Sequence, residues 1–472
     1  MSPSRLLALV LAACGALPPA ALANPQLAAI FQDHAVLQRD KPIVIWGSAD
    51  PGEHMAVAFV GQTIPVTAGA DGKWSVTLEA QGANGSGADL TVAGKAVLTL
   101  HDILIGDVWI CAGQSNMEFT VEAHDGIYGT ENAAAEVAAA SYPSIRQFKV
   151  ARRASDSAAA EVTGTWQPCS PEAVGQFTAV GYFFARELTD RLNIPIGIIN
   201  VSWARTPIEA WMNPEALAAF PGFSNGHPLP GAAAGTEDPW VPSSLFNGML
   251  SPLVRLGVRG FVWYHGESNV GHAADYARQF PALITGWRAR FGQGELPFIW
   301  VQLANYAPHE VQPGEPWAYL REAQSKALSL PQTGQAVAID IGETGNVYPH
   351  NKQEVGRRLA LIAKALVYGF AVDYSGPVFD KAVAAGDTMR VHFLFAGEGL
   401  TASGKPLQSF ELAGADKVFH PASANISGDS VIVRSLAVPK PVAVRYAWRN
   451  APEANLFNGA GLPAAPFRSD AW

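Results

Sequence analysis

A serine at position 115 follows an apolar run in the stretch 107–118, DVWICAGQSNME. The run begins like a buried β-strand, but Gly113 breaks it and three polar residues, Gln114, Ser115 and Asn116, follow. A serine hydroxyl at a strand end can attack a carbonyl carbon, and nearby backbone N–H groups would then face the resulting oxyanion. The same tripeptide also fits a loop or a helix cap, so its role depends on the elements around it.

Strands that alternate with helices are predicted from Asp102 to about Phe370. This order predicts an α/β fold in which a parallel sheet is covered by helices on both faces. Ligands bind such sheets at the carboxyl ends of the strands, which is where Ser115 would stand. The clearest predicted helices span residues 179–192, 273–291 and 351–369. The last of them carries four apolar residues on one face: Val355, Leu359, Ile362 and Leu366.

Two further regions show the short alternating runs and turn dipeptides of β structure. We expect a signal peptide at 1–23, a β-sandwich segment at 24–100, the sheet-and-helix domain at 101–372 and a C-terminal β domain at 373–472. The N- and C-terminal β segments are expected to form one associated β-sandwich. The segment Asn213–Trp240, rich in Pro, Gly and Ala, predicts a long loop of the kind that often borders an active site.

The first residues predict export from the cytoplasm. Arg5 precedes an apolar stretch at 6–17, and Ala21-Leu22-Ala23 supplies a small-residue cleavage pattern. In an alternative interpretation Cys14 lies in a lipoprotein box and carries a lipid anchor. No other segment of the sequence reaches the roughly 20 apolar residues that cross a bilayer. We therefore expect an exported soluble protein, either periplasmic or secreted.

Composition and charge narrow the class of partner. Hydrophobic residues make up 49% of the chain and charged residues 15%, which suits a large buried core. The net charge of −9 and the lack of a Lys/Arg run argue against binding to nucleic acid or to an anionic membrane. After the signal peptide only Cys111 and Cys169 remain, so at most one internal disulfide can form, and Cys111 is expected to be a buried strand residue.

Five stretches, in order, resemble the sialate O-acetylesterase group of SGNH hydrolases, which also includes bacterial acetylesterases that act on plant polysaccharides. They cover nearly the whole mature chain: DVWICAGQSNMEF, PIGIINVSWARTPIEAWM, LFNGML followed by RGFVWYHGESN, IDIGETGNVYPHNKQEVGRRLAL, and VRYAWRNAPEANLFNGAGLPAAPFRSD. The resemblance implies a flavodoxin-like SGNH hydrolase domain with an associated β-sandwich. It also implies ester hydrolysis without a metal or cofactor, with Ser115 as the nucleophile.

Two departures from the family pattern concern the oxyanion hole. The family usually has a Gly pair after the Trp of its second block, and this chain has Ala204-Arg205. A backbone donor survives that change, so Ala204 and Ser115 are predicted oxyanion donors, while Arg205 can bind a sugar substituent or pair with Glu209 on the surface. Where the family reads WYQGESN this chain has His265, which can replace the Gln as a donor or lie satisfied in the core. The predicted substrate-binding or loop-orienting residues are Gln114, Asn116, Arg205, Glu267 and Asn269.

The third departure concerns the general base. The family typically shows a histidine within a pattern like DIHPKNK, and an ungapped count places Tyr348 at that position. A phenol, with a reference pKa of about 10, is a poor base at neutral pH. His350 is the predicted base, with His265 as the alternative. A carboxylate should orient the imidazole, and Glu343 and Asp340 are both candidates for that role.

These features predict a carbohydrate O-acetylesterase, a serine hydrolase acting on acetylated plant polysaccharide fragments such as xyloglucan or xylan, or on sialic acid. The alternative is a non-catalytic glycan-binding protein in which the loss of the expected histidine has disabled the site. No histidine pair has metal-ligand spacing such as HExxH, so we predict no catalytic metal. His124, His272 and His309 are placed in loops that can line the cleft, and Trp211, Trp240 and Trp317 are candidates for stacking on sugar faces.

Overall fold

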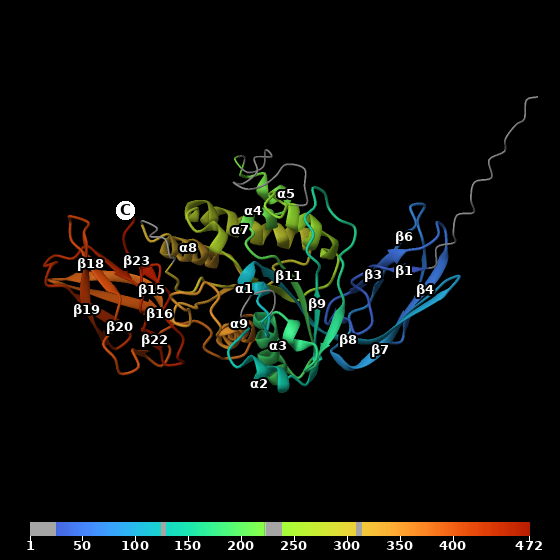
Figure 1. The fold of residues 1–472 in the computed structure, drawn as a ribbon, viewed down its shortest axis with the longest axis horizontal. Coiled ribbons are helices and arrows are strands. Elements are labelled where there is room, and N and C mark those ends of the chain that lie inside the picture. The colour runs from blue at the N-terminus through green and yellow to red at the C-terminus, as the bar shows by residue number, and fades with distance from the viewer. Residues whose placement is uncertain (1–24, 124–128, 221, 223–237, 308–313) are drawn as a thin grey trace, which may run out of the picture.

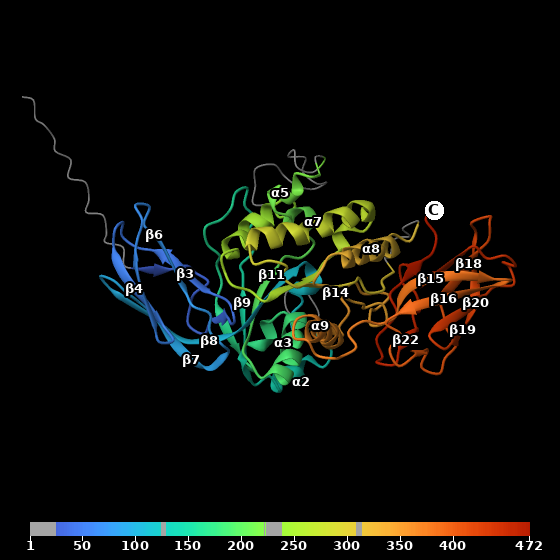
Figure 2. The same ribbon diagram turned by 180° about the vertical axis from the view of Figure 1, so that it is seen from behind.

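The computed structural model describes residues 25–123, 129–220, 222, 238–307 and 314–472. It places three regions along the long axis of the molecule (Figure 1). A β region of N-terminal residues lies at one end, a sheet with helices lies in the middle, and a β region of C-terminal residues lies at the other end. The view from behind shows the same order (Figure 2). The predicted signal peptide and Cys14 lie outside the described residues.

The central sheet is parallel, as the alternation of strands and helices predicts. Its strands run in the order β9-β11-β8-β12-β13-β14, with β10 antiparallel at the β9 edge. Without β10 and β9, the remaining strands lie in the order β11-β8-β12-β13-β14, which is 2-1-3-4-5 in chain order, the flavodoxin-like order. The strands are β8 (Val97–Gly113), β9 (Tyr142–Lys149), β10 (Trp166–Cys169), β11 (Ile196–Ser202), β12 (Gly260–Tyr264), β13 (Phe298–Val301) and β14 (Thr333–Ala336).

Helices cover both faces of this sheet (Figure 1). On one face lie α3 (Ala179–Leu192) and α9 (Lys352–Leu366), and on the other lie α7 (Ala273–Phe291) and α8 (Pro316–Ser325). The predicted bounds of α3 and α7 are confirmed, and α9 ends three residues before the predicted limit of 369. The Thr178 side chain caps the start of α3, and Asn193 in a left-handed conformation ends it. The short helices are α1 (Ser115–Glu118), α2 (Ala133–Ala138), α4 (Ile208–Trp211) and α5 (Pro214–Leu217).

The N-terminal β region is joined to the central sheet by one strand. β8 pairs with β7 in its first half and with β11 and β12 in its second half. The predicted boundary between residues 100 and 101 therefore falls inside a continuous strand, and the two regions share one apolar core. The other strands are β1 (Gln26–Leu27), β2 (Val36–Gln38), β3 (Ile43–Ser48), β4 (His54–Phe59), β5 (Gln62–Thr67), β6 (Lys73–Leu78) and β7 (Asn84–Ala93).

The C-terminal β region has its own sheet and its own core. Among the described residues, none of its strands pairs with an N-terminal strand. The prediction that both termini build one sandwich is therefore wrong, because the central region lies between them and each β segment buries its own apolar face. The strands are β15 (Val378–Ala385), β16 (Thr388–Leu394), β17 (Leu400–Thr401), β18 (Phe410–Ala413), β19 (Phe419–Ser427), β20 (Ser430–Arg434), β21 (Ala443–Tyr446), β22 (Phe457–Asn458) and β23 (Phe467–Arg468).

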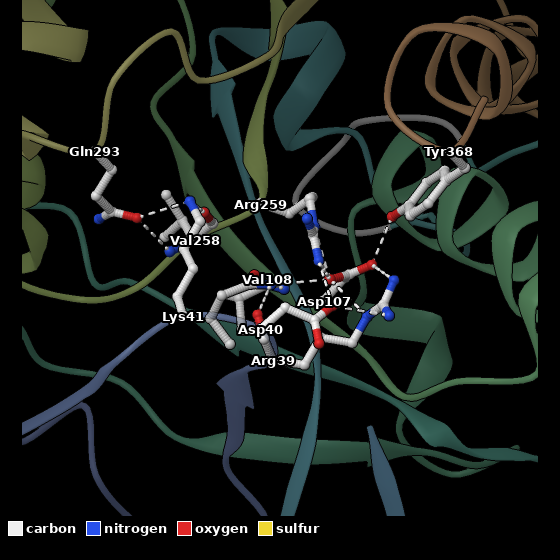
Figure 3. Close-up of polar contacts among 10 residues, drawn as sticks. Arg39, Asp40, Lys41, Asp107, Val108, Val258, Arg259, Gln293 and Tyr368 are labelled. Atoms are coloured by element: carbon white, nitrogen blue, oxygen red, sulfur yellow. Dashed lines mark hydrogen bonds and ion pairs between the residues drawn. The ribbon is translucent and has the colours of Figure 1, made fainter. Parts of the chain in front are cut away.

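A buried carboxylate holds the strand that leads to Ser115. Asp107 accepts hydrogen bonds from Arg39 Nε at 3.1 Å, Arg259 Nε at 2.8 Å, Gln38 Nε2 at 2.9 Å and the Tyr368 hydroxyl at 2.8 Å (Figure 3). Burial alone would raise the pKa of Asp107, but Arg259 and the donors from Arg39 and Gln38 outweigh it and hold the pKa below its ordinary value. The cluster joins the N-terminal region, β8, the segment before β12 and the end of α9.

Two further sequence predictions can be checked in this part of the chain. Cys111 and Cys169 are both buried and both free, so they form no disulfide with each other. Within the described residues, no helix is long and apolar enough to cross a membrane.

Candidate active site

Ser115 is the first residue of α1, the short helix that follows β8. The turn between them depends on Gly113, which has a φ of +142° and lies so close to β12 that an added Cβ would approach the Tyr264 carbonyl oxygen within 2.2 Å. Only glycine fits such a position. Gln114 then donates its backbone N–H to the same Tyr264 oxygen at 3.1 Å. Ser115 thus stands at the carboxyl end of β8, where the parallel sheet predicts it.

The second block supplies a donor to Ser115, but from Arg205 rather than from Ala204. The Arg205 N–H donates to Ser115 Oγ at 3.3 Å, whereas the Ala204 N–H donates to the Glu118 carboxylate at 2.9 Å. Ala204 is therefore excluded as an oxyanion donor, because its N–H already donates to the Glu118 carboxylate. Arg205 has a φ of +64°, a left-handed conformation that favours glycine, which explains why the family usually has Gly here.

The Arg205 side chain is exposed, and Glu209 is not within ion-pair distance of it. Glu209 is only 1% exposed, and it accepts hydrogen bonds from Asn269 and Gln279 instead. Of the two alternatives for Arg205, the surface ion pair with Glu209 is therefore excluded, and contact with a sugar substituent stays a prediction. Asn269 also accepts the Ile208 N–H at 2.9 Å, so its side chain orients the second and third blocks rather than facing a substrate.

Glu343 and His350 form a close pair in the fourth block. His350 Nδ1 lies 2.6 Å from Glu343 Oε1, and the His350 backbone N–H donates to the same oxygen at 2.7 Å. Burial works to raise the pKa of Glu343, but these bonds and one from Asn346 hold the pKa below its ordinary value. A carboxylate that stays ionised beside Nδ1 fixes the tautomer that leaves Nε2 as the basic nitrogen.

Asp340, the other candidate carboxylate, lies elsewhere. Its two oxygens accept Arg358 Nη1 at 2.6 Å and Arg358 Nη2 at 2.7 Å, a bidentate pair between α9 and the end of the sheet. Asp340 therefore does not orient His350. Tyr348, at the position of the family histidine, only shapes the local turn, since its backbone N–H and carbonyl both bond the Asn346 side chain.

The loop that carries Glu343 and His350 packs against the nucleophile helix. Asn116 Nδ2 donates to the Val347 carbonyl at 3.0 Å, and the His350 ring lies edge-on to Phe119 with centroids 6.3 Å apart. Phe119 directly follows α1. The loop of the histidine is therefore held against the helix of the serine by two residues that follow Ser115, Asn116 and Phe119.

His265 is buried away from Ser115. Its Nε2 lies 2.8 Å from the Thr206 carbonyl, its Nδ1 lies 3.4 Å from the Tyr276 hydroxyl, and its ring stacks on Trp263. Burial lowers the pKa of His265 to about 3, although the bond to Thr206 acts in the opposite direction. A ring nitrogen this close to a carbonyl oxygen must carry the proton, so the Nε2–H group of His265 donates to the Thr206 carbonyl. This excludes His265 from the oxyanion hole and makes it a poor base.

Asn116, Glu267 and Lys352 form a buried polar chain that the sequence did not single out as one unit. Asn116 Nδ2 donates to Glu267 Oε1 at 2.5 Å, and Asn116 Oδ1 accepts Lys352 Nζ at 2.6 Å. With the bond to Val347, all the polar atoms of the Asn116 amide are in use, so Asn116 has no donor left for a sugar. A lysine at the start of an amphipathic helix predicts an exposed cation, which is why Lys352 was missed.

A cavity of about 480 Å³ opens beside α1. Its lining includes Glu118, Arg152, Ser202 and Gln167. Arg152 donates to Glu118 at 2.8 Å and lies 5.8 Å from the centre of the Trp203 ring. Glu118 ends the helix that begins at Ser115, so a sugar in this cavity would lie beside that helix, where polar side chains can bond its hydroxyls.

The other predicted cleft residues divide into three groups. Trp211 and Trp317 are buried, so neither offers a face to a sugar, and Trp240 is half-buried. His272 is exposed. His124 and His309 lie outside the described residues, as does much of the predicted loop 213–240. Among the described residues, no group of three or more His, Cys, Asp or Glu side chains could hold a metal ion.

Comparisons with known proteins point to one family. A family model described as "Carbohydrate esterase, sialic acid-specific acetylesterase" matches residues 105–364. The sialate O-acetylesterase of Homo sapiens is 30% identical over 94% of this chain and 92% of its own length, and that of Rattus norvegicus is 29% identical over 94% of each. A crystal structure of "a novel carbohydrate acetylesterase" from Xanthomonas citri is 44% identical, with a TM-score of 0.87 over 95% of this chain and all of that one.

Proposed function

Because the chain belongs to the sialic acid-specific acetylesterase family of carbohydrate esterases and is thus a carboxylic ester hydrolase, we propose that it deacetylates glycans by SGNH-type catalysis at Ser115. The observation that carries this proposal is the Glu343–His350 pair, held at 2.6 Å in a loop that packs on the nucleophile helix. The pair supplies the base that Tyr348 cannot supply. We therefore favour the esterase over the glycan-binding alternative.

The proposed reaction begins with Ser115 Oγ attacking the acetyl carbonyl carbon while His350 Nε2 takes its proton. The carbonyl oxygen becomes an oxyanion, which accepts the N–H groups of Arg205 and Ser115. His350 then returns the proton to the departing sugar oxygen, and an acetyl ester remains on Ser115. Water then attacks that ester while His350 takes its proton, and His350 returns the proton to Ser115 Oγ as the bond to the acetyl group breaks and acetate leaves. Glu343 stabilises the imidazolium that forms in each half of the reaction.

The proposed glycan-binding region is the cavity beside α1. Two basic side chains line it, Lys149 and Arg152, and Arg152 is already paired with Glu118, so the cavity holds no clamp of several arginines. A neutral acetylated oligosaccharide of the xyloglucan or xylan type fits this arrangement at least as well as sialic acid. We also infer from residues 1–23 that the protein acts outside the cytoplasm, as a periplasmic or secreted enzyme.

Acetate release from both substrate classes tests this proposal. We expect the wild-type protein to release acetate from acetylated xyloglucan or xylan oligosaccharides, or from an O-acetylated sialic acid, and from an aryl acetate. Ser115→Ala should abolish all of these activities and leave the fold intact. A folded wild-type protein that binds glycans but hydrolyses neither the sugars nor the aryl acetate would instead support the glycan-binding alternative.

A further inference from the structure

The position of Lys352 is energetically unfavourable for a cation. It is fully buried, and it stands at the first residue of α9, where the helix dipole disfavours a cation. Burial lowers the pKa of Lys352 to about 7, against the opposing effects of Glu267 and Glu343. Removing one member of a buried charge pair is costly, but apolar side chains in place of all its members are often neutral or stabilising. Stability of the fold therefore does not require a lysine here.

The ammonium group of Lys352 contacts residues in and beside the helix that begins at Ser115. Lys352 Nζ donates to Asn116 Oδ1 at 2.6 Å, and it lies 4.5 Å from the centre of the Phe119 ring and 5.5 Å from that of Tyr264. Asn116 lies in the nucleophile helix, Phe119 directly follows it, and the Tyr264 carbonyl accepts the Gln114 N–H. One side chain thus touches the helix that begins at Ser115, the residue just after that helix, and the end of the neighbouring strand β12.

Asn116, which accepts the Lys352 ammonium, also bonds two other segments of the chain. Its Nδ2 donates to Glu267 Oε1 in the third block and to the Val347 carbonyl, three residues before His350. Lys352 itself lies two residues after His350 on the same chain. The amide of Asn116 is therefore fixed from three sides, and two of those sides belong to the loop that carries the proposed base.

We propose that Lys352 is a positioning residue of the esterase reaction, which holds the Ser115 helix against the His350 loop through the side chain of Asn116. The inference rests on the proposed function, since it assumes that Ser115 and His350 react together. Small displacements of reacting groups are costly because the reaction requires near-contact geometry. Loss of the ammonium should therefore slow the chemical step more than it weakens substrate binding.

The test compares Lys352→Met with the wild type on an aryl acetate. We expect kcat to fall about 10- to 100-fold, because a misplacement of about 1 Å can cost that much, while KM stays within about threefold. We expect the melting temperature to fall, because Asn116 Oδ1 loses its donor and Glu267 loses a nearby cation, so kcat is measured per folded molecule. Lys364→Met is the matched control, since Lys364 lies on the same helix, about 18 Å further along, and pairs with Glu187. It should keep the wild-type kcat.

A double-mutant cycle with Asn116→Ala separates positioning from a general structural effect. If Lys352 acts through Asn116, the double variant should be no slower than the slower single variant. Independent, multiplicative losses would overturn the inference, as would a wild-type kcat in Lys352→Met beside an inactive Ser115→Ala. Should Lys352→Met fail to fold, Lys352→Gln takes its place with the same expected loss of kcat. Full turnover by Ser115→Ala would overturn the proposed function and this inference together.

Discussion

At the scale of single residues, Glu343 and Asp340 form a natural pair of variants, because they lie three residues apart and have different partners. Glu343→Gln should lower kcat by roughly 10²- to 10⁴-fold, since the amide no longer fixes the imidazole tautomer or stabilises the imidazolium. Steady-state kinetics on an aryl acetate measures this effect.

Asp340→Asn is the matched control. It weakens the bidentate pair with Arg358, so we expect a lower melting temperature with kcat within a few-fold of the wild type. A large loss of kcat in a folded Asp340→Asn, beside an active Glu343→Gln, would show that the carboxylate roles are reversed.

The residue types of the site could be read from the sequence, but several of their contacts could not. The position of Ser115 follows from the strand and Gly113, and the His350–Glu343 pair was among the options left open. The N–H that faces Ser115 belongs to Arg205 and not to Ala204, because the backbone adopts a left-handed conformation at Arg205. The spacing of residues along the sequence does not reveal that the Glu118 carboxylate accepts the Ala204 N–H. The partners of the buried His265 ring are likewise not evident from the sequence, since Thr206 lies 59 residues away and Tyr276 lies on the following helix.

At the scale of elements, the junction of β8 and α1 depends on close contact with β12. Gly113→Ala adds a Cβ that would lie 2.2 Å from the Tyr264 carbonyl oxygen, so the two strands cannot keep their register. We expect a large fall in melting temperature and loss of activity, because backbone strain alone costs of order 1–3 kcal/mol and overlap with backbone adds to it. Thermal unfolding followed by circular dichroism measures the change.

Gly82→Ala is the control for this variant, because an added Cβ there meets no atom within 4 Å and its φ is not in the positive range. It should unfold at the wild-type temperature. Equal stability of Gly113→Ala and Gly82→Ala would show that the β8–β12 contact does not constrain the turn. The elements themselves were well predicted, since apolar periodicity and capping residues are local signals, and α3 and α7 have the predicted bounds.

At the scale of the whole molecule, Asp107 connects three parts of the chain. Asp107→Asn leaves Arg39 and Arg259 with a neutral partner in a buried site, and breaking a buried pair typically costs about 3–5 kcal/mol. We expect a loss of that size in the free energy of unfolding at neutral pH, measured by denaturant titration. Activity per folded molecule should change little, since Asp107 lies at the opposite end of β8's parallel segment from Ser115.

The pH dependence gives a second signature of the same cluster. The pKa of Asp107 is held below its ordinary value in the folded state, so its stabilising effect is present above an unfolded value of about 3.9 and is lost as the pH falls through the folded value. Asp107→Asn should therefore lose less stability than the wild type on acidification below about pH 4. A parallel loss in both proteins would contradict the assignment.

The arrangement of the three regions was the least predictable feature. Two β segments at the ends of a chain can pair with each other or fold apart, and alternating apolar residues look the same in both cases. The structure resolves this through the length of β8, which carries the N-terminal region into the central sheet, and through the separate core of the C-terminal region.

The most direct test of the central claim, that His350 activates Ser115, is the kcat of His350→Ala on an aryl acetate. Because a serine hydroxyl is a weak nucleophile without a base, we predict that His350→Ala falls nearly to the level of Ser115→Ala. His265→Ala should lose stability, since it leaves the Thr206 carbonyl without a donor, but its folded fraction should keep measurable turnover. Near-normal turnover in His350→Ala beside an inactive, folded His265→Ala would contradict the account.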